Sequence, residues 1–386
     1  MKYLDLETIS DFVCTGSDCP FTCCGGGWEI RIDEKTYDYY RSVTGKMKER
    51  FDNSIVREDD KIIFKLTEDL NCPFLNDKGL CDIYINLGEE HLCFTCTYYP
   101  RYSFRSGDIC FSGVSISCPE VSKFFLTHKD PLMIDFAEDN AHSPEEGTVD
   151  WNLFNQTVRV FTNAVSIAQN RDLYINERLA LILIFVNRFQ ECLDNGNSPE
   201  VTIRLFSDPS GYINLLPQTG IYNRDFGSKV KFASEVLNYF KQLAALERRF
   251  PELCSIIEHF NSPGCSPVDP EHWAESYQWT NDRNNDFWQE NILVYSLFRY
   301  FMDNSSGYGF YKKLTTGVIL VLCVTDSILS LYRLQNGTDA PLDYKIMLIS
   351  HLSRLVEHGS ATREHAYNHF FSNGICDMSF LLKLIS

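Results

Sequence analysis

The spacing of apolar residues changes along the chain, and this change predicts two structural parts. In the first 120 residues, short apolar segments are separated by Gly, Pro, Asn and Asp, which is typical of a loop-rich region. After about residue 150, apolar residues recur at helical spacing. We therefore expect an α+β fold that is mainly α. A small loop-rich region over residues 1–125 would pack on a larger, mostly helical domain over residues 126–386.

Four short elements are predicted in the first part. WEIRI at 28–32 alternates apolar and charged residues, which is typical of a short strand, and KIIFKL at 61–66 is a second candidate. Asp33 is placed to cap the helix that follows it. RYSFRSGDICFSG at 101–113 predicts a hairpin. Because such a region has little room for a core, a metal would supply the stability that packing cannot.

Helical periodicity runs through most of the second part. The apolar run from Leu179 to Val186 is bounded closely by charged residues and asparagine, so it predicts a buried helix rather than a membrane span. Residues 228–250 predict a helix with one apolar face. Further helices are predicted over 151–169, 288–303, 341–358 and 375–385, and long loops over 195–225 and 261–285.

Residues 314–332 form a stretch that is nearly long enough to cross a bilayer. Asp326 and three threonines make it a poor span, so we expect a buried core helix. Peripheral association with a membrane stays open as an alternative.

Composition and charge narrow the class of partner. Of the 386 residues, 44% are hydrophobic and 23% are charged, which is typical of a globular protein. The formal net charge of −17 does not suit a phosphate backbone and argues against nucleic acid as a partner. It would suit a basic partner or lysines on a protein substrate, although solubility alone is the more ordinary explanation.

The cysteine content points away from disulfides. Asp5, Glu7 and Asp11 interrupt any apolar leader, so we expect no signal peptide and a cytoplasmic location, where thiols stay reduced. The 15 cysteines are also an odd number. Five of them are scattered in the second part, where ordinary burial explains them. The other ten are Cys14, Cys19, Cys23, Cys24, Cys72, Cys81, Cys93, Cys96, Cys110 and Cys118.

A metal site explains this clustering better than a catalytic thiol does. Structural zinc usually shows paired C-x2-C knuckles, and only Cys93 and Cys96 have that spacing. The adjacent Cys23 and Cys24 fit one tetrahedral ion poorly, and an iron–sulfur cluster tolerates irregular spacing, so the pattern favours iron–sulfur over zinc. A nucleophilic cysteine needs one thiol and a base, and does not account for ten. Cys93 and Cys110 fit an ordinary core cysteine as well as a ligand.

The order of the motifs resembles a known family. CTGSDCPFTCC at 14–24, CPFLNDKGLCDIY at 72–84, TCTYYPR at 95–101 and SCPE at 117–120 resemble the cysteine-rich domain family described as zinc- or iron-chelating. GGGWEIRID after the double cysteine, and LGEEHLCFTCTYYPR later, resemble the flagellin lysine-N-methylase branch of that family in enterobacteria. The resemblance is dense over roughly 12–120 and thinner through the helical part.

This resemblance implies an S-adenosylmethionine-dependent protein-lysine N-methyltransferase. It would methylate the ε-amino group of surface lysines of flagellin in the cytoplasm, with a cysteine-held [4Fe-4S] cluster. Residues 1–125 would then be a cysteine-rich metal-binding region. The resemblance implies as metal ligands Cys14, Cys19, Cys23, Cys24, Cys72, Cys81, Cys96 and Cys118. These are more than one four-iron cluster needs, so some would be structural or serve a second metal.

Two departures limit what the resemblance implies. The C-x3-C-x2-C motif of radical enzymes that use S-adenosylmethionine is absent, because position 26 is Gly26, and no G-x-G-x-x-G loop opens a helix after a strand. We therefore assign no catalytic and no cofactor-binding residue. Tyr98, Tyr99 and Arg101 are interpreted as packing the metal loop rather than lining a lysine site. The alternative function is a non-catalytic zinc- or iron-binding scaffold or chaperone; the oligomeric state stays open.

Overall fold

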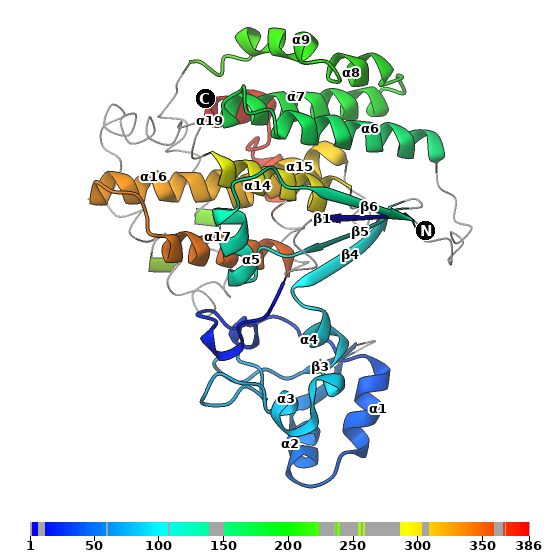
Figure 1. Cartoon of the computed structure of the whole chain (residues 1–386), viewed down its shortest axis with the longest axis vertical. Helices are drawn as coiled ribbons and strands as arrows, with labels where there is room; N and C mark the ends of the chain where they lie inside the picture. The colour runs from blue at the N-terminus through cyan, green and yellow to red at the C-terminus, as the bar shows by residue number, and fades with distance from the viewer. Residues whose placement is uncertain are drawn as a thin grey trace.

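Two hydrophobic cores organise the protein. The computed structural model describes residues 2–6, 12–58, 61–106, 109–138, 150–223, 286–302, 309–358, 366 and 368–385, with a few single positions between 235 and 258. A small core runs from Ile30 to Cys96, and a large one includes Leu6 and continues from Ile109 to Ile385. We call residues 14–98 the cysteine lobe and the rest the helical domain; Figure 1 shows the cysteine lobe below the helical domain.

The predicted fold class, α+β and mainly α with a small loop-rich region on a larger helical part, is confirmed. The domain boundary expected near residue 125 stays a prediction. The two cores separate between Cys96 and Ile109, and the first strand of the chain belongs to the large core.

The cysteine lobe consists of short elements around a two-stranded sheet. β2 (Ile55–Glu58) pairs antiparallel with β3 (Lys61–Phe64), as the pattern at 61–66 predicted. The predicted strand at 28–32 lies along β3 but forms only one bridge, between Arg31 and Ile63. The Asp33 carboxylate accepts a hydrogen bond from the backbone N–H of Thr36 and caps the next helix, as predicted. The helices of the lobe are η2 (Gly16–Asp18), η3 (Cys23–Gly25), α1 (Glu34–Ser42), α2 (Lys46–Ser54), α3 (Asp82–Leu87), η4 (Glu89–His91) and α4 (Phe94–Tyr98).

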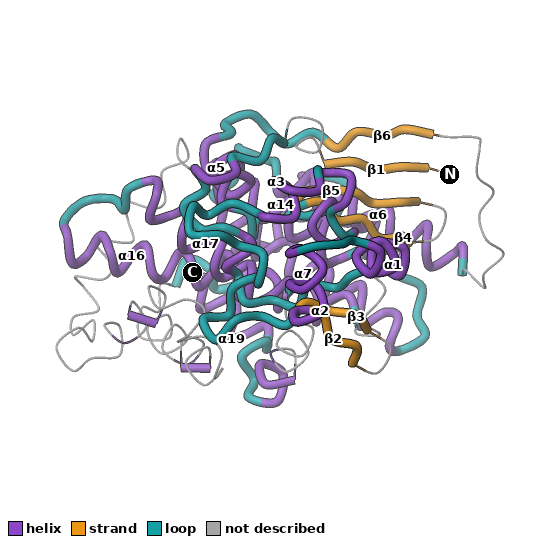
Figure 2. The backbone as a smooth tube through the Cα atoms, turned by 90° about the horizontal axis from the view of Figure 1, so that it is seen from below, coloured by secondary structure: helices purple, strands orange, loops and turns teal. Residues whose placement is uncertain are grey.

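A four-stranded sheet joins the start of the chain to the predicted hairpin. The strand order is β4 (Arg101–Ser106), β5 (Ile109–Val114), β1 (Lys2–Leu6) and β6 (Ile134–Glu138). β4 and β5 are antiparallel, as the hairpin prediction requires, whereas β1 runs parallel to β5 and antiparallel to β6. Figure 2 shows the four strands side by side at one edge of the helical domain. Phe111 of β5 anchors the sheet, because its ring contacts Phe161 and Phe298 of the helices.

The helical domain is built around a long buried helix, α7 (Ile175–Asp194). The run from Leu179 to Val186 is buried within it, except for the half-buried Ile184, as its apolar sequence predicted. The Glu177 carboxylate caps the helix by accepting a hydrogen bond from the backbone N–H of Tyr174. The other elements are α5 (Pro119–Thr127), α6 (Trp151–Ala168), α8 (Glu200–Leu205), α9 (Pro209–Tyr212), η5 (Ile213–Gln218), α14 (Phe287–Ser296), η6 (Leu297–Phe301), α15 (Phe310–Gly317), η7 (Val318–Cys323), α16 (Val324–Asn336), α17 (Leu342–Glu357) and α19 (Met378–Ile385).

Most of the helix predictions are confirmed, and one loop prediction is wrong. Helices α6, α14, α17 and α19 occupy the four ranges predicted for them. The long loop expected over 195–225 contains α8, α9 and η5 instead, because Ile203 and Phe206 pack into the large core and hold these short turns. The helix predicted over 228–250 lies almost entirely outside the described residues, and the loop predicted over 261–285 lies wholly outside them.

Residues 314–332 belong to a helical stretch with a widened turn. η7 is a π-helix between α15 and α16, and η6 extends α14 in the same way. At Gly317 a Cβ atom would lie 2.4 Å from the ring of Tyr300, so only glycine permits the close approach of α15 to η6. Among the described residues, no helix combines the length and the apolar character that crossing a bilayer requires.

A buried ion pair joins α7 to α14. Arg178 donates a hydrogen bond to the Glu290 carboxylate at 2.7 Å, and each side chain is only 1% exposed. Arg178 also donates to the carbonyl groups of Leu173 and Ala168, and Arg171 donates to the same carboxylate at 2.8 Å. Because each charge has partners, the pair is tolerated inside the core; the loss of either partner would leave a buried charge without compensation.

Replacement of this carboxylate should strongly destabilise the fold. For Glu290→Gln we expect the free energy of unfolding, measured by urea denaturation, to fall by about 3–5 kcal/mol, because Arg178 would remain buried without a countercharge. Glu200→Gln is the matched control, since its pair with Arg159 is largely exposed and water screens such pairs, so stability should hardly change. Equal urea midpoints for Glu290→Gln and wild type would show that the pair does not hold the two helices together.

Candidate metal centre and its junction with the helical domain

An aromatic core positions the cysteine-bearing segments of the lobe. The rings of Tyr40 and Phe51 stack at 4.1 Å, and the Tyr40 hydroxyl donates to the carbonyl of His91. The Asp33 carboxylate accepts a hydrogen bond from the backbone N–H of Phe94 at 3.0 Å. These long-range contacts fix the start of α4, where two of the cysteines lie.

Three cysteines stand at helix N-termini. Cys81, Cys93 and Cys118 are the N-cap residues of α3, α4 and α5. Burial raises the pKa of Cys81 and of Cys118, and backbone N–H groups of the first helical turn oppose this rise; at Cys93 the contact with Cys96, helped by such N–H groups, lowers the pKa. A cysteine placed directly before a helix is thereby a better metal ligand than one in a helix interior.

Cys93 and Cys96 form the closest thiol pair. Their Sγ atoms are 3.6 Å apart, and two sulfurs bound to one tetrahedral ion at about 2.3 Å would stand about 3.8 Å apart. The contact with Cys96 lowers the pKa of Cys93, while the same contact and burial raise the pKa of Cys96. The sequence left Cys93 open between ligand and core cysteine; the C-x2-C spacing was the signal that pointed to it.

Four further thiols of the lobe, those of Cys23, Cys24, Cys72 and Cys81, lie near this pair or near one another. Burial, together with the nearby charges of Cys81, Cys93 and Cys23, raises the pKa of Cys72 to about 12. Cys96 is influenced in the same way by Cys24 and Cys72. The backbone N–H of Cys72 donates to the carbonyl of Cys24 at 2.7 Å, which ties two of the segments together. The thiols of three segments, 23–24, 72–81 and 93–96, are thus near enough to influence one another's pKa values.

A second set of thiols lies toward the helical domain. Burial, together with charges on Cys19 and Cys23, raises the pKa of Cys118 to about 12. Cys14 is exposed and Cys19 is half-buried. Cys110 lies in β5 opposite Arg105 of β4, so it belongs to the sheet rather than to the cysteine lobe.

The donor chemistry of the lobe fits a thiolate-bound metal group. In the part of the chain that the structure describes, no three His, Cys, Asp or Glu side chains lie close enough together to hold a metal ion. The convergence of soft sulfur donors from three segments nevertheless matches a group that collects ligands from several loops. Residues that would hold it are Cys23, Cys24, Cys72, Cys81, Cys93 and Cys96, with Cys14, Cys19 and Cys118 beside them.

One arginine of the helical domain reaches into the cysteine loop. Arg354 of α17 is buried; its Nη2 donates to the carbonyl of Phe21 at 2.5 Å and its Nε donates to the carbonyl of Ser117 at 2.9 Å. Burial raises the pKa of Cys19, and the contact with Cys24 together with burial raises the pKa of Cys23. The positive charge of Arg354 opposes both increases. Sequence reasoning missed Arg354, because no local motif links it to loops more than 200 residues away.

A buried carboxylate lies at the same junction. Glu357 accepts hydrogen bonds from the hydroxyl groups of Ser115 and Tyr295, both at 2.8 Å, and its carboxylate is 3.6 Å from Arg299. Burial alone would raise the pKa of Glu357, but Arg299, His358 and the hydrogen bonds outweigh burial and lower the pKa. The carboxylate therefore stays ionised inside the junction.

Aromatic residues close the junction. Trp28 packs against Tyr99 at 4.6 Å and against His358 at 4.4 Å, and the ring nitrogen Nε2 of His358 lies 2.8 Å from Ser117 Oγ. Gly27, just before Trp28, has a φ of 66°, so the glycine triplet makes a tight turn there. Tyr99 is half-buried, and its hydroxyl lies 3.2 Å from Ser117 Oγ.

Comparisons with known proteins identify relatives of the chain. Residues 162–384 match the family described as the FliB lysine N-methylase C-terminal domain. The chain is 30% identical over 132 residues to the "Flagellar biosynthetic protein FliU" of Salmonella muenchen, which covers 33% of this chain and 78% of that protein. It is 28% identical over 139 residues to proteins named "Lysine-N-methylase" from Salmonella choleraesuis and Salmonella typhimurium. That match covers 33% of this chain and only 33% of each lysine-N-methylase, and no solved structure matches.

Thiol burial predicts an order of chemical reactivity. In reduced, metal-free protein at pH 8, iodoacetamide should modify the exposed Cys14 first and Cys72 and Cys118 last. A pKa of about 12 leaves only about one thiol in 10⁴ ionised at that pH. Peptide mass spectrometry at increasing times measures the order, with urea-unfolded protein as the reference in which the differences should vanish. Modification of Cys72 and Cys118 as fast as Cys14 would contradict the buried placement.

Loss of the junction arginine should loosen the cysteine loop. For Arg354→Ala we expect the free energy of unfolding to fall by about 3 kcal/mol, because two buried carbonyl groups lose a charged donor. Hydrogen exchange should also accelerate over residues 14–28. Arg57→Ala is the control, since Arg57 forms an exposed pair with Glu34 worth about 0–1 kcal/mol. If hydrogen exchange over residues 14–28 were unchanged in Arg354→Ala, the arginine would not be what orders the loop.

Proposed function

The chain belongs to the FliB lysine N-methylase family, and we propose on that basis that it is a lysine methyltransferase. In this proposal S-adenosylmethionine donates the methyl group, and the ε-amino groups of surface lysines of flagellin accept it in the cytoplasm. The observation that carries the proposal is the family match over residues 162–384, which span most of the helical domain. The relatives named for lysine methylation and for flagellar biosynthesis support the reaction and the link to flagellin.

The reaction imposes a simple chemical balance. The lone pair of the lysine nitrogen forms a bond to the methyl carbon, the bond from that carbon to sulfur breaks, and its electrons return to sulfur in S-adenosylhomocysteine. One proton leaves the nitrogen. Because lysine has a pKa of about 10.4, the site must favour the neutral amine before attack. The net charge of −17 would attract a lysine-bearing substrate to the protein surface.

We further propose that the cysteine lobe holds a [4Fe-4S] cluster. Support comes from the thiols of three segments, which are near enough to influence one another's pKa values, and from the Cys93–Cys96 pair with its Sγ atoms 3.6 Å apart. When bound, such a cluster would supply a structural brace and a redox-active centre. The chain itself would bring the thiols together, and Arg354 would hold the loop that carries Cys19 and Cys23.

A second candidate is a metal-binding scaffold without catalysis. The polar groups at the junction favour it, because Glu357 is fully enclosed and hydrogen-bonded to protein groups. Tyr99 is half-buried, and desolvation of its hydroxyl raises its pKa, so it is held as a neutral phenol. Neither group is therefore presented to a substrate.

Methyl transfer can be measured directly. We expect anaerobically purified protein to bind S-adenosylmethionine saturably and to produce methyl-lysine on purified flagellin, detected by peptide mass spectrometry. Flagellin whose lysine amines are acetylated, and therefore carry no nucleophilic nitrogen, serves as the control acceptor. Saturable binding without transfer to flagellin would redirect the search to another lysine substrate. Absence of both would favour the scaffold.

The metal content of cysteine variants tests the proposed centre. Cys93→Ala and Cys96→Ala should lose most of the iron and acid-labile sulfide found in the wild type, because both thiols stand at the start of α4. Cys110→Ala is the matched control and should keep both, since Cys110 lies in β5. If Cys93→Ala kept the full content of iron and sulfide, Cys93 would not be a ligand of the cluster. Stoichiometric zinc without sulfide in the wild type would replace the cluster with a zinc site.

A further inference from the structure

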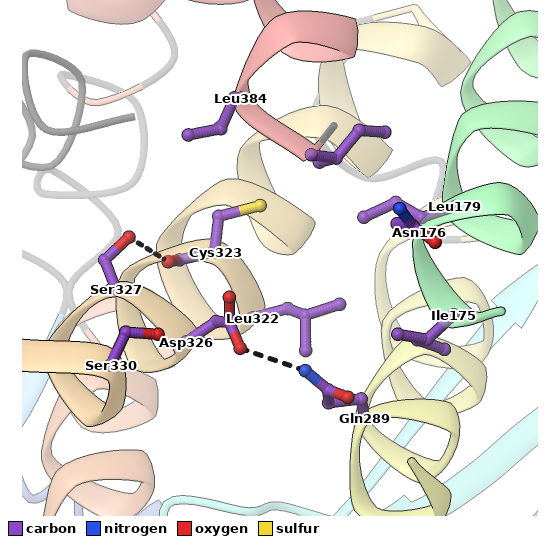
Figure 3. A pocket seen from close by; sticks show the side chains of 11 residues that line it. Ile175, Asn176, Leu179, Gln289, Leu322, Cys323, Asp326, Ser327, Ser330 and Leu384 are labelled. Carbon is purple, nitrogen blue, oxygen red and sulfur yellow. Dashed lines mark hydrogen bonds between the residues drawn. The ribbon is translucent and has the colours of Figure 1, made fainter. Parts of the chain in front are cut away.

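A small pocket opens in the helical domain where four elements meet. It lies between the start of α7, the start of α14, the η7–α16 junction and the end of α19, and its volume is about 40 Å³ (Figure 3). None of the elements that form it belongs to the cysteine lobe. The pocket is therefore a feature of the helical domain alone.

The lining divides into aliphatic walls and a polar side. The walls are Ile175, Leu179, Leu322, Leu384 and Ile385, and the polar side is made by Asn176, Gln289, Cys323, Asp326, Ser327 and Ser330. Among the described lining residues, Asp326 contributes the one carboxylate, and there is no Lys, Arg or His. The pocket thus combines hydrogen-bond acceptors with surfaces that suit methylene groups.

The polar side is held in place by neighbouring side chains. The Gln289 amide donates to Asp326 Oδ1 at 3.0 Å, and the Ser327 hydroxyl donates to the carbonyl of Cys323 at 2.8 Å. Figure 3 shows Asp326 and Gln289 meeting across the pocket from α16 and α14. The carboxylate therefore has a fixed orientation before any ligand arrives, which lowers the cost of binding.

One buried hydroxyl in the lining lacks a partner. Ser330 is fully buried, and its Oγ makes no hydrogen bond within the part of the chain that the structure describes. A buried hydroxyl normally finds a partner, because leaving it unsatisfied costs about 1–3 kcal/mol. Ser330 lies one helical turn after Asp326 on α16, so a single group in the pocket can approach both.

A π-helical turn leads directly into this side of the pocket. η7 ends at Cys323, and the three polar residues of α16 that line the pocket follow it. Single π-turns inside α-helices are frequent at functional sites, because they cost stability and rotate the residues that follow. The π-helical turn therefore lies directly before the residues of α16 whose side chains line the pocket.

We propose that this pocket binds a primary alkylammonium group carried on an aliphatic stem. The ammonium would donate hydrogen bonds to the Asp326 carboxylate and to Ser330 Oγ, and the stem would lie against Leu179 and Leu384. A volume of about 40 Å³ is several times the roughly 10–15 Å³ that a single water needs, so the pocket admits the end of such a chain. Anions are disfavoured by the carboxylate. The group belongs either to a lysine side chain or to a free small amine.

Titration of the full chain with matched ligands tests the proposal. Isothermal calorimetry should show saturable binding of n-butylamine and at least tenfold weaker binding of n-butanol, which has the same stem without the charge. Binding of Nα-acetyl-lysine methylamide as well as butylamine would assign the group to a lysine side chain, and binding of butylamine alone would assign it to a free amine. Binding of neither, or equal binding of butanol, would overturn the proposal.

Two variants connect the binding to this pocket. Asp326→Asn should weaken butylamine binding at least tenfold, and Ser330→Ala should weaken it several-fold; the second variant serves if the first does not fold. Asp343→Asn is the control, because Asp343 is an exposed carboxylate at the start of α17. Unchanged affinity in folded Asp326→Asn or Ser330→Ala would place the amine elsewhere. Methyl transfer to flagellin is measured separately, so failure of this pocket and failure of the proposed methyltransferase can be told apart.

Discussion

The position of the cysteine loop depends on one buried guanidinium group. Arg354 bridges the carbonyl groups of Phe21 and Ser117, which belong to segments nearly 100 residues apart in the chain. Buried carbonyl groups need donors, and a planar arginine can serve two at once without changing its charge state. The loop with Cys19 and Cys23 and the segment before Cys118 are therefore ordered by the same side chain. The geometry of any metal centre here depends on the helical domain as much as on the cysteines.

Convergence of thiols has an electrostatic consequence. Burial and mutual repulsion raise the pKa values of Cys72 and Cys118, so the thiols are protonated when no cation is present. A bound metal group would reverse this balance, because its positive charge favours thiolates, and it would release protons as it binds. The lobe has only a small core of its own, and cross-linking its three segments would add stability that packing cannot provide.

Helix α14 connects the features of the helical domain. Gln289 orients the carboxylate of the small pocket, Glu290 forms the buried ion pair with α7, and Tyr295 donates to Glu357 at the junction with the cysteine lobe. These three side chains lie within two turns of one helix that is buried almost throughout. A displacement of α14 at one of these sites would therefore also change the contacts at the other two, because packed cores do not deform continuously.

What the sequence determined by itself was local. The period of α6, the apolar run of α7, the Asp33 cap and the hairpin of β4 and β5 follow from neighbouring residues, so the pattern predicted them. The crowding of cysteines before residue 120 likewise indicated a thiol-rich site. Tertiary structure decided the pairing of β1 with β5, the short helices at 200–218 and the contacts of Arg354 and Glu357. These depend on residues that are distant in the chain, and only packing of the whole molecule brings such residues together.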